Sequence, residues 1–115
     1  MADANYSQDA ESGSWKTVCG VEDIRIGEVK SLMLDGKALC LIRAQDAFYC
    51  IDDTCSHEDY PLSSGEVDFD SCEIECYMHG SIFSLLTGEP QNLPATKPVD
   101  VYQVSVVGEE IRVLL

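Results

Sequence analysis

Apolar and polar residues alternate over short stretches of this chain, and that alternation is typical of half-buried β-strands. No stretch shows a sustained apolar period of 3.6 residues, so the pattern does not indicate a helix of useful length. The predicted strands are residues 15–19, 28–34, 37–44, 47–51, 72–76, 81–84, 101–107 and 110–115. The sequence therefore predicts a mostly β fold.

Turn residues separate these strands at the places where hairpins need them. Asp35-Gly36 predicts a two-residue hairpin turn, and Gln45-Asp46 predicts the next turn. Three strands in a row would then form a meander that ends just before Cys55. The last two strands are expected to pair across Val107-Gly108-Glu109, so the chain would end as a hairpin.

The meander leads into a pattern of cysteine and histidine. Cys55-Ser56-His57 and Cys76-Tyr77-Met78-His79 each supply one thiolate and one imidazole, and 18 residues separate them. In an extended loop, residues i and i+2 point to the same side, so the first pair can address one centre. The second pair needs a tighter turn, which Gly80 permits. Two such loops, face to face, could hold a metal centre between them.

Two kinds of centre fit this ligand set. Two cysteines and two histidines suit either a tetrahedral zinc ion or a [2Fe–2S] cluster in which two histidines replace two cysteines on one iron. Zinc sites of this composition usually have a pair of cysteines at one end and a pair of histidines at the other. Here each half carries one ligand of each type, which favours the cluster and leaves zinc as the alternative.

This segment resembles the signature of the Rieske [2Fe–2S] proteins, Cys-x-His followed by Cys-x-x-His. The flanking residues 51–54 and 80–83 are also similar to the small Rieske ferredoxins of aromatic-ring dioxygenase systems, and the resemblance runs from Ser14 to the C-terminus. It implies a Rieske domain over residues 14–115, with an antiparallel β base and an inserted, smaller cluster-binding subdomain at about residues 52–98. Residues 1–13 are polar and acidic, and we expect a flexible tail there.

The resemblance also implies a role for each ligand. Cys55 and Cys76 would bind the inner iron, and His57 and His79 the outer iron. The chain would be a one-electron carrier, without catalytic residues of its own, that takes electrons from a ferredoxin reductase and passes them to a terminal oxygenase acting on an aromatic compound. The alternatives are a Rieske ferredoxin of another redox or cluster-assembly pathway, and a zinc-stapled interaction module.

Three positions near the ligands depart from other members of the family. Rieske proteins of quinol-oxidising complexes join the two ligand loops by a disulfide, and its positions are Tyr60 and Met78 here. High-potential members have a serine and a tyrosine hydroxyl after the second histidine. Ser81 keeps the first, while Phe83 lacks the second. The loss of one donor predicts a low reduction potential, roughly −150 mV.

The other residues exclude several functions. Both histidines of the chain belong to the motif, so none remains for the mononuclear iron of an oxygenase, and no glycine-rich nucleotide motif is present. A net charge of −14 disfavours nucleic acid as a partner, favours a monomer and suits steering toward basic redox partners.

The sequence also predicts where the protein resides and what its four other cysteines do. No export signal or membrane-spanning run is evident, so we expect a cytoplasmic protein with free thiols. Cys19, Cys40, Cys50 and Cys72 lie in apolar or alternating runs and are expected to be small buried hydrophobes.

Overall fold

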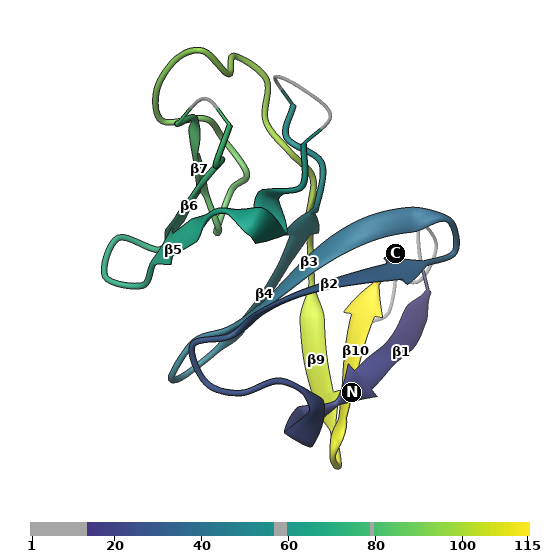
Figure 1. Cartoon of the computed structure of the whole chain (residues 1–115). Coiled ribbons are helices and arrows are strands. Elements are labelled where there is room, and N and C mark those ends of the chain that lie inside the picture. The colour runs from purple at the N-terminus through teal and green to yellow at the C-terminus, as the bar shows by residue number, and fades with distance from the viewer. Residues whose placement is uncertain (1–13, 57–59, 79) are drawn as a thin grey trace.

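The computed structural model describes residues 14–56, 60–78 and 80–115. Within these ranges the chain forms three antiparallel β-sheets and two short 3₁₀ turns, η3 (Val21–Asp23) and η4 (Leu62–Ser64) (Figure 1). The predicted mostly β fold is therefore confirmed.

The first and last strands form one sheet. Strand β1 (Trp15–Gly20) pairs with β10 (Glu110–Leu114), which pairs in turn with β9 (Val104–Val107). The β9–β10 hairpin turns at Gly108, whose φ is 63°. This pairing confirms the predicted C-terminal hairpin and joins the two ends of the described chain.

The meander forms a second sheet in the order β2–β3–β4–β8. Its strands are β2 (Val29–Leu34), β3 (Lys37–Arg43), β4 (Phe48–Asp52) and β8 (Val101–Tyr102). Asp35 and Gly36 both have positive φ, 52° and 81°, as the predicted two-residue turn between β2 and β3 requires. Strand β4 ends directly before the first ligand loop, so the sheet fixes where that loop begins.

The third sheet contains β5 (Glu66–Asp68), β6 (Glu73–Glu75) and β7 (Ile82–Ser84). In the chain it lies between β4 and β8, and in space it stands apart from the first two sheets (Figure 1). Strand β6 ends directly before Cys76. The boundaries of the expected subdomain at about residues 52–98 stay a prediction.

Two apolar cores follow from this arrangement. One lies between the first two sheets and includes Leu39, Leu41, Ile111 and Val113. The other lies between the second and third sheets, where its buried residues are Cys40, Ile42, Ile51, Cys55, Leu62, Ile74, Cys76, Phe83, Leu85, Ala95 and Val99. Strand β3 alternates between them, so Leu39 and Leu41 face one core while Cys40 and Ile42 face the other.

Two strand predictions were wrong in detail. Residues 101–107 do not form one strand, because Val101–Tyr102 pairs with β4 whereas Val104–Val107 pairs with β10. The Tyr102 hydroxyl donates a 2.7 Å hydrogen bond to Asp52 Oδ1, which stabilises the pairing with β4. Strand β5 was missed because three residues with a single apolar position give almost no periodic signal.

The predicted N-terminal tail, residues 1–13, lies outside the described residues. Among the residues that the structure describes, no helix has the length and apolar composition needed to cross a membrane.

Candidate metal centre

The first ligand loop is closed at its base by backbone contacts. The Cys55 N–H donates a 2.9 Å hydrogen bond to the Tyr60 carbonyl, and Thr54 forms an isolated β-bridge with Pro61. These contacts place Cys55 inside the fold, where its exposed fraction is 3%. His57, the second predicted ligand of this loop, lies outside the described residues.

The second ligand loop is a tight turn between β6 and β7. The Cys76 N–H donates to the Ser81 carbonyl at 2.7 Å, and the Gly80 N–H donates to the Cys76 carbonyl at 3.0 Å. Gly80 has a φ of 76°, a conformation that glycine adopts readily. Cys76 is 1% exposed, while His79, the other predicted ligand, lies outside the described residues.

Cys55 and Cys76 follow strands of different sheets, yet both are buried in the same apolar cluster. A pair of thiolates buried among apolar side chains needs a cationic centre to offset the cost of removing their charges from water. The donor set therefore fits an iron–sulfur centre held between the loops. Without the two histidines, residues 14–56, 60–78 and 80–115 contain no group of three metal-ligating side chains.

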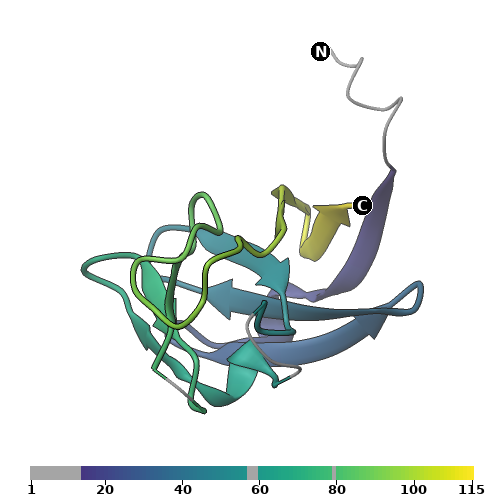
Figure 2. The ribbon, with the colours of Figure 1, turned by 90° about the horizontal axis from the view of Figure 1, so that it is seen from above.

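The segment between β7 and β8 connects to both ligand loops (Figure 2). The Ser56 hydroxyl donates to the Lys97 carbonyl at 2.5 Å, and the Ala95 N–H donates to Ser81 Oγ at 3.1 Å. Asn92 accepts a hydrogen bond from the Ile82 N–H at 2.7 Å and donates one to the Gly80 carbonyl at 3.0 Å. The segment thus holds the two loops in a fixed arrangement.

An aromatic pair also joins the two loops. The rings of Tyr60 and Tyr77 stack with their centroids 6.2 Å apart and an interplanar angle of 19°. Tyr60 is half-buried against the apolar cluster, whereas Tyr77 is 72% exposed. This difference in exposure suits packing against the cluster for Tyr60 and surface contact for Tyr77.

Three large apolar side chains of the second ligand loop and the β7–β8 segment are exposed. Tyr77, Met78 and Leu93 are 72%, 47% and 76% exposed, and Leu93 follows Asn92, which bonds to the second loop. We call these three residues the apolar rim. Leu93-Pro94 is a cis peptide bond, and Ala95 after it is buried in the same cluster as the two cysteines.

Ser81 and Phe83 are the two residues from which the sequence predicts a low reduction potential. Both are fully buried. Because Ser81 Oγ accepts a hydrogen bond from the Ala95 N–H, its own proton is available for a second acceptor in this buried region. Phe83 fills the apolar cluster and offers no hydroxyl.

The remaining cysteines divide into two groups. Cys40 and Cys50 are fully buried, as predicted, and burial raises the pKa of the Cys50 thiol to about 12 and that of Cys40 further. Cys19 and Cys72 are only half-buried, so their prediction was wrong. Cys19 lies at a register shift in β1, an edge strand, and Cys72 lies in the β5–β6 turn with a φ of 60°.

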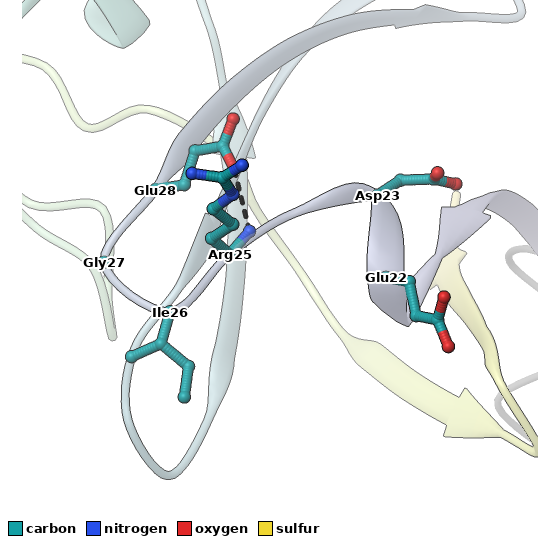
Figure 3. Close-up of a pocket in the computed structure, with 6 residues that line it drawn as sticks. All are labelled: Glu22, Asp23, Arg25, Ile26, Gly27 and Glu28. Atoms are coloured by element: carbon teal, nitrogen blue, oxygen red, sulfur yellow. Dashed lines mark hydrogen bonds between the residues drawn. The ribbon is translucent and has the colours of Figure 1, made fainter.

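A hollow of about 630 Å³ lies away from the ligand loops. Residues 22, 23 and 25–28, between η3 and β2, line it, and the Arg25 N–H donates to Glu28 Oε1 at 2.7 Å (Figure 3). In Figure 1 this segment runs below β2 and β4, whereas β5–β7 lie above them. The hollow therefore has no direct part in the metal centre.

Sequence reasoning missed Asn92, Ser56 and Asp53 as supports of the site. Asn92 and Ser56 gave no signal, because their partners are backbone atoms 10 to 41 residues away. For Asp53 the sequence contains a weak signal. Strand alternation carries its side chain to the same side as buried Ile51, an unusual place for a carboxylate.

Comparison with known proteins identifies the class. Residues 14–103 match the Rieske [2Fe–2S] domain, and this chain belongs to that family. It therefore carries a Rieske-type [2Fe–2S] cluster, which supplies one-electron chemistry when bound.

Its relatives are ferredoxins. Ferredoxin CarAc of Metapseudomonas resinovorans is 38% identical over 100 residues, 86% of this chain and 92% of that protein. The 3-phenylpropionate/cinnamic acid dioxygenase ferredoxin subunit of Escherichia coli (strain K12) is 37% identical over 94 residues, 81% of this chain and 86% of that one. The chain is accordingly an electron-transfer protein and not a catalytic subunit.

Solved structures of ferredoxins also match this chain. The ferredoxin of carbazole 1,9a-dioxygenase from Nocardioides aromaticivorans IC177 matches with a TM-score of 0.82 and 34% identity, over 87% of this chain and 96% of that one. A ferredoxin chain in the complex of reduced oxygenase and oxidized ferredoxin of carbazole 1,9a-dioxygenase matches with a TM-score of 0.78 and 36% identity, over 86% and 91% of the two chains.

Proposed function

We propose that this chain is the ferredoxin component of a multicomponent dioxygenase that acts on an aromatic compound. It takes one electron at a time from a ferredoxin reductase and delivers it to the terminal oxygenase. The relatives at 37–38% identity, whose names include a dioxygenase ferredoxin subunit, support this role. The shared burial of Cys55 and Cys76 between two closed loops is the structural observation that carries it.

We further propose that Cys55 and Cys76 hold the inner iron and that His57 and His79 hold the outer iron. The two cysteines are 3% and 1% exposed, which suits the ligands of a shielded iron. Tyr77 and Met78, between Cys76 and His79, are exposed, so this loop reaches the surface just before the histidine. An electron would leave through the imidazole side, and the apolar rim would contact the oxygenase there.

Reconstitution tests the role. The purified chain is mixed with a candidate ferredoxin reductase and a candidate aromatic-ring oxygenase, and product formation is followed with and without the chain. We expect turnover to depend on the chain and to saturate as its concentration rises. If reductases reduce it but no aromatic-ring oxygenase reoxidises it, the chain serves another redox or cluster-assembly pathway. A colourless protein with stoichiometric zinc would contradict the carrier role altogether.

A further inference from the structure

Asp53 is an acidic residue buried beside the first ligand loop. Its exposed fraction is 3%, and among the described residues it is the one acidic or basic residue that is buried. No lysine or arginine in residues 14–56, 60–78 and 80–115 forms an ion pair with it. Burying a carboxylate costs free energy unless hydrogen bonds replace its water, so its partners need to be identified.

Three hydrogen-bond donors take the place of water at the Asp53 carboxylate. The Ser31 hydroxyl donates to Oδ2 at 2.8 Å, the Ser63 hydroxyl donates to Oδ2 at 3.0 Å, and the Ser63 N–H donates to Oδ1 at 2.7 Å. Both carboxylate oxygens therefore accept hydrogen bonds, which offsets the cost of their burial.

The backbone of Asp53 extends the connection. Its N–H donates to the Ala38 carbonyl on β3 at 3.0 Å, and its carbonyl accepts from the Leu62 N–H at 2.5 Å. Ser31 belongs to β2, while Leu62 and Ser63 belong to η4, directly after the first ligand loop. Asp53 therefore ties that loop, at both of its ends, to the second sheet.

The position of the charge gives it a second effect. Only Thr54 separates Asp53 from Cys55, which limits the distance between their Cα atoms to about 7 Å. Cys40, in the same apolar cluster as Cys55 and Cys76, has a pKa raised first by burial and then by the Asp53 charge. The carboxylate thus lies beside the apolar cluster that contains Cys55 and Cys76.

We propose that Asp53 is a positioning residue that anchors the first ligand loop and, through its fixed buried charge, lowers the reduction potential of the centre. Reduction adds a negative charge, and a nearby carboxylate opposes that addition. Because the carboxylate is shielded from solvent, salt screens its effect much less than that of the surface charges. This inference rests on the proposed ligation by Cys55.

Potentiometric titration of the loaded protein tests the proposal with three variants and a surface control. Asp53→Asn removes the charge and keeps the shape. Ser31→Lys brings a cation against the carboxylate from an exposed position on β2, an edge strand of its sheet, and leaves Asp53 in place. Ser31→Ala removes one anchoring hydrogen bond and keeps the charge, and Asp46→Asn, in the exposed β3–β4 turn, is the surface control.

We expect Asp53→Asn and Ser31→Lys each to raise the equilibrium constant for reduction on the order of tenfold, which is 59 mV for a one-electron couple. The shift should persist at 1 M NaCl. Ser31→Ala should lower the thermal unfolding midpoint without raising the potential, and Asp46→Asn should change neither.

The outcomes distinguish this proposal from the proposed ligation by Cys55, on which it rests. A loaded Asp53→Asn or Ser31→Lys protein with the wild-type potential would overturn the charge effect, even if its stability falls. If Asp53→Asn fails to fold, Ser31→Lys decides the matter alone. A wild-type protein without a Rieske spectrum would instead contradict the ligation by Cys55.

Discussion

At the scale of single residues, the same amino acid serves two purposes in this protein. Cys40 and Cys50 lie on adjacent strands, fully buried, and burial raises their thiol pKa values so that they stay protonated. Cys55 and Cys76 are as deeply buried but lie in loops at strand ends, where two loops meet. Position on a strand or at its end therefore separates the packing thiols from the two proposed ligands.

The buried thiol of Cys50 predicts alkaline sensitivity. Its pKa is about 12 in the folded protein against 9.0 for an unperturbed thiol, so the unfolded chain loses this proton first. The free energy of unfolding is therefore unaffected by this thiol below pH 9, and it declines between pH 9 and 12. The loss at pH 10.5 is on the order of 2 kcal/mol.

Thermal unfolding midpoints at pH 8 and pH 10.5 measure this effect. The difference between the two pH values should be smaller in Cys50→Ala than in the wild-type protein, whereas Cys19→Ala, at a half-buried thiol, should change it less. An equal difference in wild type and Cys50→Ala would contradict the assignment.

Ser81 offers a second test at this scale. The Ser81 hydroxyl oxygen accepts a hydrogen bond from the Ala95 N–H. The hydroxyl proton is therefore left to stabilise a nearby negative charge. We expect Ser81→Ala to lower the midpoint potential on the order of 50 mV, which corresponds to ~1.2 kcal/mol for one electron. Ser105→Ala, at a half-buried serine of β9 outside the ligand loops, serves as the control for the loss of a hydroxyl. A potential that does not fall in Ser81→Ala would mean that the hydroxyl points elsewhere.

At the scale of elements, the site consists of two loops that belong to different sheets and a third segment that holds them. Local hydrogen bonds close each loop at its base, but they do not connect one loop to the other. The connection comes from the β7–β8 segment and from the stacked rings of Tyr60 and Tyr77. The stack therefore replaces part of what a covalent link between the loops would provide.

A double-mutant cycle on the aromatic pair tests this connection. Tyr60→Ala, Tyr77→Ala and the double variant are compared by the rate at which the visible absorption of the cluster disappears with a chelator present. We expect faster loss in each single variant and a coupling energy of about 0.5–1.5 kcal/mol. Additive effects of the two substitutions would show that the rings act independently.

Much of this element structure could be predicted from the sequence. The hairpins at Asp35-Gly36 and Gly108 follow from turn chemistry and local alternation, and the turn at Gly80 follows from the ligand spacing. The break at Gln103 could not be predicted, because it depends on which sheet each half of the segment joins. The role of Asn92 could not be predicted for a similar reason, because its hydrogen-bond partners are distant in the sequence.

At the scale of the whole molecule, charge dominates the surface. The chain has 21 acidic and 7 basic residues, a net charge of −14. A field of this size raises the rate at which the protein meets basic partners, and added salt screens it. We propose that the apolar rim then provides short-range contact after the encounter.

If charge speeds the encounter and the apolar rim acts only at short range, electron delivery should respond to salt in a specific way. The second-order rate constant for reoxidation of the reduced chain by its oxygenase should fall by about tenfold between 0.05 M and 0.5 M NaCl. Turnover at saturating concentrations of the chain should change little, which provides the control. Stopped-flow absorbance measures both, and a rate constant that is independent of salt would contradict steering by charge.

The ligand set of the cluster is the central claim, and the spectrum of a His79→Ala variant tests it most directly. The purified wild-type protein should contain two irons and two acid-labile sulfides per chain, with the paramagnetic signal of a Rieske cluster on reduction. In His79→Ala that signal should disappear, together with electron delivery to the oxygenase. An unaltered Rieske signal in His79→Ala would contradict the account.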